Sequence, residues 1–280
     1  MVIHFQDNIN IMESIFTNVY ETHEWGTNNH TKYNGSSGGG SEINYNKDSY
    51  VPFLRNLIID NNINTIVDLG CGDFRCGHIL YDDLDITYTG YDAYKKVTDY
   101  NSTQYPLPKY TFTHLDFCNN KESIVGGDLC ILKDVIQHWS LDNIYKFLDY
   151  LVEQKKFKYI LICNCDYQKQ DNTDIKTGMF RPLSCRFLPL RKYNPTKVYN
   201  YNTKEVSVIA LTNIMPIIAP VHAPAPKQEV QLVNIPVTDD NVAFNIIVSL
   251  SALAQQRGAF NVQETAKLSE CINRFTRKSN

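Results

Sequence analysis

Two glycines and an acidic residue form the part of this chain best suited to bind a small molecule. Asp68, Gly70 and Gly72 continue a short β-branched run, residues 65–67, and residues 74–81 can then begin a helix. Glycine has no Cβ, so the backbone there can turn sharply and come close to a ligand. A strand, a glycine-rich turn and a helix start are typical of a nucleotide-binding βαβ unit, although such turns are also common elsewhere.

Acidic residues also end the next two strand-like runs. Asp92 lies 24 positions after Asp68, and a carboxylate there can accept hydrogen bonds from both hydroxyls of a nucleoside ribose. Asp116 could accept a hydrogen bond from an adenine amine while Phe117 flanks the ring. Each acid has a simpler interpretation, Asp92 as a helix N-cap and Asp116 as a solvated strand end.

The order of the elements indicates how these residues meet. Strand-like and helical runs alternate, which predicts an α/β fold with a mostly parallel sheet covered on both faces. Ligands of such sheets bind beyond the carboxyl ends of the strands, where Lys133, Asp134 and Asn164 also fall. The predicted strands are 65–69, 86–92, 110–116, 128–134 and 157–164, with an antiparallel edge pair near 197–201 and 206–213. The predicted helices are 8–24, 47–62, 74–81 and 141–154.

A glycine- and serine-rich segment, residues 36–41, precedes the second predicted helix. One interpretation is a flexible linker. The other is a mobile lid that closes over a ligand and uses Trp25 as an apolar anchor. A linker is oddly placed here, because the residues before it are too few to form a domain.

Proline and alanine mark the clearest boundary, at residues 219–229, which predict a semi-stiff linker. Residues 1–218 form the predicted α/β domain with its N-terminal helix and lid. Residues 230–280 predict a small appendage, a short strand at 230–237 followed by a helical hairpin. Because so small a hairpin has little core of its own, we expect it to dock on a neighbour or to self-associate into an oligomer.

Composition excludes several classes of protein. Hydrophobic residues make up 43% and charged residues 20%, with a net charge of −3, which does not suggest a general nucleic-acid-binding surface. No apolar run reaches the roughly 20 residues that span a bilayer, and the N-terminus lacks an apolar signal-peptide core, so we expect a cytoplasmic protein. The eight cysteines lack paired C-x-x-C spacing, which predicts buried free thiols and no metal site.

Taken together, these segments resemble the class I S-adenosylmethionine-dependent methyltransferases. The resemblance rests on V-D-L-G-C-G-D at 67–73, Y-T-G-Y-D at 88–92, L-D-F at 115–117 and D-L-C-I-L-K-D-V-I-Q-H-W at 128–139. More narrowly, the chain is similar to an uncharacterised methyltransferase-like family with W-G…S-G-x-G-S, K-D-V-[LI]-Q-H and D-I-x-x-G-x-x-R-P-L segments. The corresponding segments here are residues 25–41, 133–138 and 174–183.

The resemblance implies a Rossmann-like, doubly wound sheet of the seven-stranded type with an antiparallel edge, and S-adenosyl-L-methionine as the cofactor. The glycine turn would hold the methionine and ribose side of the cofactor, Asp92 the ribose hydroxyls, and the Asp116–Phe117 pair the adenine. Lys133 belongs with these cofactor residues and is also a candidate for the acceptor pocket. The cofactor residues of the turn itself are Asp68, Gly70, Cys71 and Gly72.

Methyl transfer to a hydroxyl or amine needs a base to take the proton. His138 is the best candidate, because its ordinary pKa lies near neutrality, with Asp134 orienting it or acting in its place. His138 could instead be a packed residue at a helix start, and Arg181 a loop salt bridge. The candidates for the acceptor site are Trp25, Asn172, Asp174 and Arg181.

The sequence thus predicts S-adenosylmethionine-dependent methyl transfer to an oxygen or nitrogen of a small molecule or glycan. One alternative is a protein or RNA acceptor, although the charge makes a nucleic-acid partner improbable. The other is a methyltransferase fold kept as a structural or binding part that assembles through its C-terminal helices.

Overall fold

The chain divides into two compact units, residues 1–222 and 223–280. The computed structural model describes residues 11–29, 32–211, 236–238, 240, 242, 243, 246, 247, 267 and 270. The predicted linker at 219–229 lies outside the described residues.

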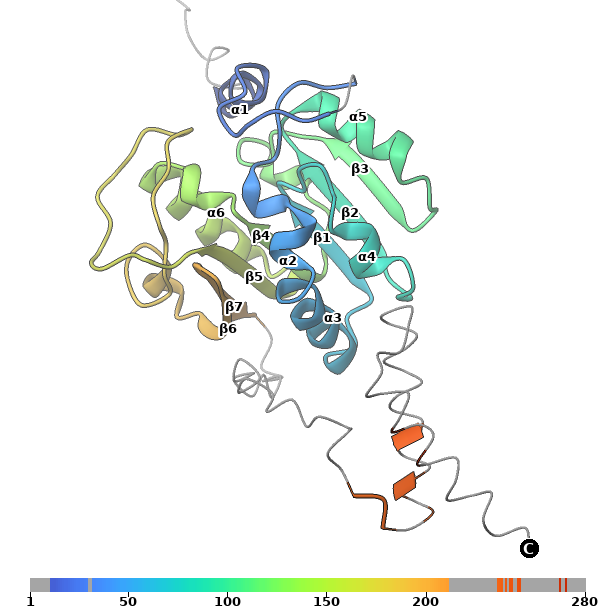
Figure 1. Ribbon diagram of the computed structural model, residues 1–280. Coiled ribbons are helices and arrows are strands. Elements are labelled where there is room, and N and C mark those ends of the chain that lie inside the picture. Colours follow the sequence, from blue (N-terminus) through green and yellow to red (C-terminus); the bar gives the residue numbers. More distant parts are fainter. Residues whose placement is uncertain are drawn as a thin grey trace, which may run out of the picture. The chain divides into compact units, whose positions relative to one another are not determined.

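Seven strands of the first unit form one sheet in the order β3-β2-β1-β4-β5-β7-β6 (Figure 1). The neighbours among β1 to β5 pair in parallel, and β7 pairs antiparallel with both β5 and β6. This is the predicted Rossmann-like, doubly wound sheet with an antiparallel edge. The strands are β1 (Thr65–Leu69), β2 (Thr87–Asp92), β3 (Tyr110–His114), β4 (Gly127–Lys133), β5 (Phe157–Cys165), β6 (Thr196–Tyr201) and β7 (Lys204–Ala210).

The helices cover both faces of the sheet. They are α1 (Ile11–Glu21), α2 (Ile43–Asn46), α3 (Tyr50–Asp60), α4 (Gly77–Tyr81), α5 (Lys95–Gln104) and α6 (Leu141–Gln154). Short 3-10 helices form at Gly39–Ser41, Lys121–Ser123, Ile136–His138 and Leu190–Tyr193.

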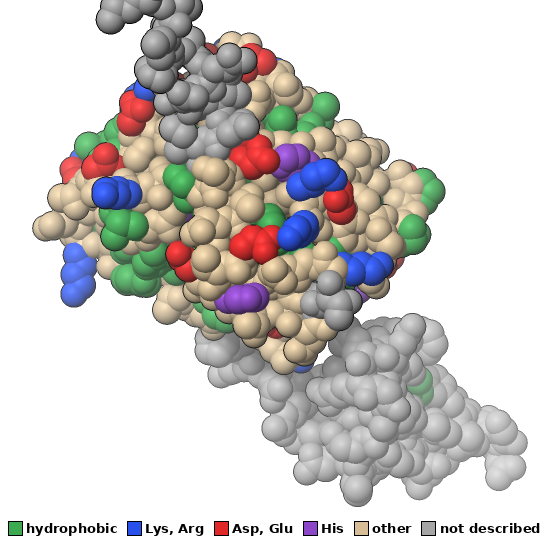
Figure 2. Space-filling model, turned by 90° about the horizontal axis from the view of Figure 1, so that it is seen from above, with side chains coloured by type: hydrophobic (Ala, Val, Ile, Leu, Met, Phe, Trp, Pro, Cys, Tyr) green, Lys and Arg blue, Asp and Glu red, His purple; other side chains and the backbone are tan. Residues whose placement is uncertain are grey.

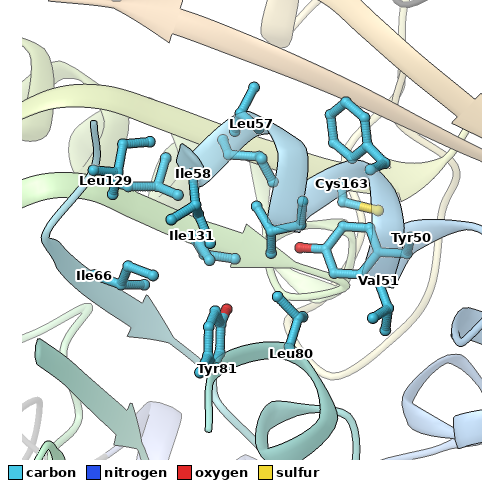
Figure 3. Close-up of a cluster of buried hydrophobic side chains, with 14 of the residues drawn as sticks. Tyr50, Val51, Leu57, Ile58, Ile66, Leu80, Tyr81, Leu129, Ile131 and Cys163 are labelled. Atoms are coloured by element: carbon cyan, nitrogen blue, oxygen red, sulfur yellow. The ribbon is translucent and has the colours of Figure 1, made fainter. Parts of the chain in front are cut away.

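Alternate strand residues face two separate cores, as the period of two in a strand requires. On one face, Leu57 of α3 and Leu80 of α4 pack with Ile66 and Ile131 of the sheet (Figure 3). On the other face, the buried apolar residues of α6 pack against the strand residues that alternate with those of the first core. These α6 residues are Ile144, Phe147, Leu148 and Leu151.

Two helices differ from the prediction. The helix expected from Phe74 begins only at Gly77, because Phe74 has a positive φ of 54° and its ring occupies the space beside Gly77. Helix α5 was not predicted, since its sequence is polar and rich in weak helix formers. Burial of Val97 and Tyr100 stabilises it against the sheet and the N-terminal segment.

The described residues of the second unit are few. Asp240, Val242 and Ile246 are helical, and Lys267 pairs with Glu270 on helical backbone, in the two regions predicted as helices. Of the strand predicted at 230–237, only its last two residues are described, and they are not in a strand.

In the part of the chain that the structure describes, no helix is long and apolar enough to cross a bilayer. Within the same residues, no three His, Cys, Asp or Glu side chains are grouped so as to hold a metal ion. The seven cysteines among them are free thiols.

The core makes a direct stability prediction on one helix. Leu54 is fully buried and Ile59 is 56% exposed, both on α3. We expect Leu54→Ala to lower the free energy of unfolding by about 2–5 kcal/mol through lost burial and a residual cavity. Ile59→Ala should change it by no more than about 0.5 kcal/mol. Urea unfolding of both variants measures the difference, and equal effects would contradict this packing.

Candidate functional site

Two adjoining pockets lie where the strand order reverses, between β1 and β4. The first has a volume of about 620 Å³ and the second about 650 Å³, including the parts open to solvent. Residues shared by both pockets are Ser37, Gly70, Gly72, Lys133 and Asp134.

The glycine turn after β1 separates the pockets and tolerates no side chain at either glycine. Gly70 and Gly72 have φ values of 83° and 53°, which L-residues rarely adopt. A Cβ on Gly70 would lie 2.4 Å from Val135 Cγ2, and one on Gly72 would lie 2.6 Å from Ser37 Oγ. Both positions therefore need glycine, because of the backbone conformation and of the side chains packed against the turn.

Asp92, at the end of β2, lines the first pocket and is anchored by backbone. Its Oδ2 accepts a hydrogen bond from Gly72 N at 3.0 Å, and its Oδ1 accepts one from Tyr94 N at 2.9 Å. The side chain is buried, and burial raises its pKa to about 6 although these two N–H groups oppose the shift. The carboxylate is thus held in one orientation toward the pocket.

Two further acids line the second pocket. Burial raises the pKa of Asp68 to about 6, against the hydrogen bond that Tyr88 donates at 2.8 Å. Asp73 is 1% exposed, and burial raises its pKa as well. Arg75 Nε makes an ion pair with Asp73 Oδ2 at 2.8 Å, whereas Oδ1 has no hydrogen-bond partner among the described residues. This pocket therefore contains carboxylates whose charge is incompletely compensated. Cys71 lines the same pocket.

The far end of the first pocket is formed by Asp116, Phe117 and Trp139. Asp116 Oδ2 accepts hydrogen bonds from Asn119 Nδ2 at 2.8 Å and from Glu13 N at 3.3 Å, so its position is fixed. The rings of Phe117 and Trp139 lie 5.9 Å apart between centroids. An acid beside aromatic rings is present here, as the sequence predicted.

A buried ionic cluster follows β4. Asp134, at a positive φ of 61°, accepts hydrogen bonds from Lys133 Nζ at 3.0 Å, from Gln137 Nε2 at 3.0 Å, and from Lys204 Nζ of β7. Burial opposes ionisation of Asp134, but the two lysines prevail and lower its pKa. A carboxylate so paired is a weak base, and its geometry suits orienting its neighbours.

The imidazole of His138 is held as one neutral tautomer. Its Nδ1 lies 3.1 Å from the carbonyl oxygen of Met179, and since a carbonyl only accepts, Nδ1 carries the proton. Nε2 is then the acceptor, 3.4 Å from Gln137 Nε2. Burial lowers the pKa of His138 to about 4. His138 lines the first pocket, with its ring 4.9 Å from that of Trp25.

The N-terminal segment lies across the glycine turn. Ser37 Oγ accepts a hydrogen bond from Asp73 N at 2.9 Å and is 2.8 Å from the Tyr20 hydroxyl. Lys133 Nζ donates to the Gly40 carbonyl at 2.6 Å. Residues 36–41 are therefore attached to the site rather than joining two domains.

Three of the residues predicted to form the acceptor site lie outside both pockets. The guanidinium of Arg181 is buried and donates to the carbonyls of Thr173 and Trp139, at 2.9 and 2.6 Å. Asp174 accepts from Leu141 N at the start of α6. Likewise, Asn172 Nδ2 donates to the carbonyl of Pro182 at 2.9 Å. None of the three lines either pocket; they fix the 172–183 loop against α6.

Several pocket or cluster residues were not found from the sequence: Tyr20, Ser37, Asp73, Gln137 and Lys204. Asp73 and Gln137 lie inside the motifs already noted and could have been found there. Ser37 lies in the glycine- and serine-rich segment noted as a candidate lid, whereas Tyr20 and Lys204 reach the site only through the fold and no local sequence signal marks them.

No protein-family model and no curated protein matches this chain. It is similar to the solved structure of the methyltransferase domain of bacterial CtHen1, at 14% identity and a TM-score of 0.44, covering 59% of this chain and 98% of that one. It is also similar to an O-methyltransferase family protein from Burkholderia thailandensis, at 12% sequence identity and a TM-score of 0.46. That match covers 60% of this chain and 56% of the other. A third similar structure is the bifunctional kinase-methyltransferase WbdD, at 14% sequence identity and a TM-score of 0.46. That match covers 61% of this chain and 40% of WbdD. At such identities the likeness concerns the fold, which the strand order already identifies as Rossmann-like.

The raised pKa of Asp68 predicts a pH dependence of stability. Its folded pKa of about 6 exceeds the ordinary value of 3.8, so the folded state binds its proton more tightly. This stabilisation is fully present below pH 3.8 and is lost as the pH rises through 6. Between pH 8 and pH 5, wild type should gain about 1 kcal/mol in free energy of unfolding relative to Asp68→Asn. Urea unfolding at several pH values measures this, and a constant difference would contradict the shift.

Proposed function

We propose that this chain transfers the methyl group of S-adenosyl-L-methionine to a hydroxyl or amine of a small molecule or glycan. The observation that carries the proposal is the backbone-anchored carboxylate of Asp92 beside a side-chain-free glycine turn, at the reversal of strand order. Ligands of open parallel sheets bind at this point.

The residues present fit this cofactor. Asp92 would hold the ribose hydroxyls, and Asp116 with Phe117 would flank the adenine. Asp73 is buried in the second pocket, and neither of its carboxylate oxygens accepts a hydrogen bond among the described residues, so a ligand group could pair with it. Carboxylates with raised pKa suit a ligand that carries positive charge, because such a ligand restores their ionised form.

Bound S-adenosylmethionine supplies an activated methyl group on a sulfonium, so the protein's main task is alignment. In this proposal His138 Nε2 accepts the proton of the acceptor hydroxyl or amine, with its tautomer fixed by Met179. Burial lowers its pKa to about 4, below the near-neutral value expected from the sequence, so it is a weaker base than that expectation implied. Gln137 bridges His138 and Asp134, which makes Asp134 a positioning residue in this proposal. The ring of Trp25 covers His138 and limits access of water.

Isothermal titration of S-adenosylmethionine tests the cofactor site. We expect wild type to bind, and Asp92→Ala to weaken binding at least about tenfold, because charge-assisted hydrogen bonds are lost. Asp92→Asn, which keeps the shape, should weaken binding as well. Asp99→Ala is the control, since Asp99 is an exposed acid of α5 outside the pockets. Absence of binding by folded wild type would overturn the proposal.

Replacement of the base separates binding from catalysis. His138→Gln should lower kcat about 10²- to 10⁴-fold, the usual contribution of a general base, while the Kd for S-adenosylmethionine stays unchanged. Transfer of tritiated methyl groups to a panel of hydroxyl and amine acceptors measures the rate. His23→Asn replaces an exposed histidine outside the pockets and serves as the control. An unchanged kcat would assign proton removal to another group.

A further inference from the structure

A continuous row of rings leads from the first pocket onto the surface. Its members are Trp25, His138, Phe180 and Tyr167, which we call the aromatic strip. Successive ring centroids lie 4.9, 5.8 and 6.2 Å apart. Trp25 and His138 line the pocket, so the strip is continuous with the site proposed for catalysis.

The outer part of the strip is unusually exposed. Tyr167, Met179 and Phe180 are 53%, 57% and 44% exposed, and they account for three of the seven exposed large hydrophobic side chains among the described residues. Such a gathering of apolar surface beside a pocket is typical of a binding surface.

Hydrogen bonds hold this surface in place. Gly178 N donates to the carbonyl of His138 at 2.8 Å, and Arg181 N donates to the carbonyl of Gln137 at 3.1 Å. Together with the contact of His138 Nδ1 to the Met179 carbonyl, they fix residues 178–181 to the 3-10 helix that carries His138. The strip is therefore preformed, which lowers the entropy lost when a ligand binds.

Charge argues against a nucleic acid on this surface. In residues 165–187, acids and bases outside the core are equal in number: Asp166, Asp171 and Asp174 against Lys169, Lys176 and Arg186. On the one face of the molecule that Figure 2 shows, acidic and basic side chains are interspersed. A single-stranded nucleic acid needs a basic groove along its phosphates as well as stacking rings.

We propose that the aromatic strip is the acceptor-binding surface and that it takes a neutral sugar chain; this inference rests on the proposed methyl transfer. The C–H face of a sugar ring is apolar and packs flat on the electron-rich face of an aromatic ring. Several rings in a row match several sugar units. Hydroxyls stand at the edge of each stacked sugar, and one of them comes to His138 Nε2 inside the pocket.

The chemical step follows from this placement. The sugar hydroxyl oxygen forms a bond to the methyl carbon, and the carbon–sulfur bond of the donor breaks with its electron pair remaining on sulfur. The hydroxyl proton passes to His138 Nε2. The products are a methyl ether and the uncharged thioether.

Titration of the full chain with neutral tetrasaccharides of glucose, mannose and galactose tests the strip, with a mixed-sequence single-stranded RNA of 12 nucleotides alongside. At least one sugar should bind and accept tritiated methyl groups. Phe180→Ala and Tyr167→Ala should each weaken its binding at least about fivefold, the scale of one lost stacking contact. Tyr167→Phe should retain binding, and Ile59→Ala is the control with equal exposure on α3.

The outcomes separate the two proposals. Binding of S-adenosylmethionine without binding of any of the three sugars overturns the strip proposal and leaves methyl transfer standing. Strip-dependent binding of the RNA in their place also overturns it. A chain that binds sugar through Phe180 without binding S-adenosylmethionine refutes methyl transfer and, with it, the acceptor role of the strip, and leaves the strip as a sugar-binding surface alone.

Discussion

The hydrogen bond from Gly72 N to the Asp92 carboxylate fixes the geometry on which the rest of the site depends. It joins the turn after β1 to the end of β2, while Asn101 of α5 donates to the Gly72 carbonyl at 2.7 Å and holds the other side of the turn. The turn reaches Asp92 only because Gly70 and Gly72 adopt positive φ beside neighbours that leave no space for a Cβ. Both pockets are shaped by this one constraint.

The same arrangement is costly for the folded protein without a ligand. Burial raises the pKa values of Asp68, Asp73 and Asp92, so each ionised carboxylate destabilises the site near neutral pH. Asp134 shows the opposite arrangement, since two lysines compensate its charge and lower its pKa. Asp73 lies between these cases, since Arg75 pairs with it and burial still raises its pKa. Perturbed carboxylates of this kind are more frequent at functional sites than elsewhere.

The sequence predicted the sheet well because strand alternation and strand-end acids are local signals. It also placed Asp92, Asp116 and His138 at or just beyond the ends of β2, β3 and β4, and all three line the first pocket. It did not indicate α5, whose helix depends on burying Val97 and Tyr100, nor Lys204, which reaches Asp134 only through the antiparallel pairing of β7. Both depend on contacts between segments distant in sequence.

The loop at 172–183 shows a second limit of such reasoning. Polar residues in a loop near strand ends were expected in the acceptor pocket, but Asn172, Asp174 and Arg181 satisfy backbone groups instead. A loop that crosses the surface must pair its own polar backbone, and side chains nearby often serve that need. The apolar residues of the same loop, Met179 and Phe180, remain exposed.

The N-terminal segment makes hydrogen bonds to residues that line the two pockets. The hydroxyls of Tyr20 and Ser37 share a hydrogen bond, Asp73 N donates to Ser37 Oγ, and Lys133 Nζ donates to the Gly40 carbonyl. Ser37 Oγ would lie 2.6 Å from a Cβ on Gly72. Each such bond contributes about 1 kcal/mol net, so a few of them hold the segment in place without making its release slow. Ser37, Asp73 and Lys133 all line the pockets. The glycine turn and residues 36–41 therefore share hydrogen bonds, so displacement of one would disturb the other.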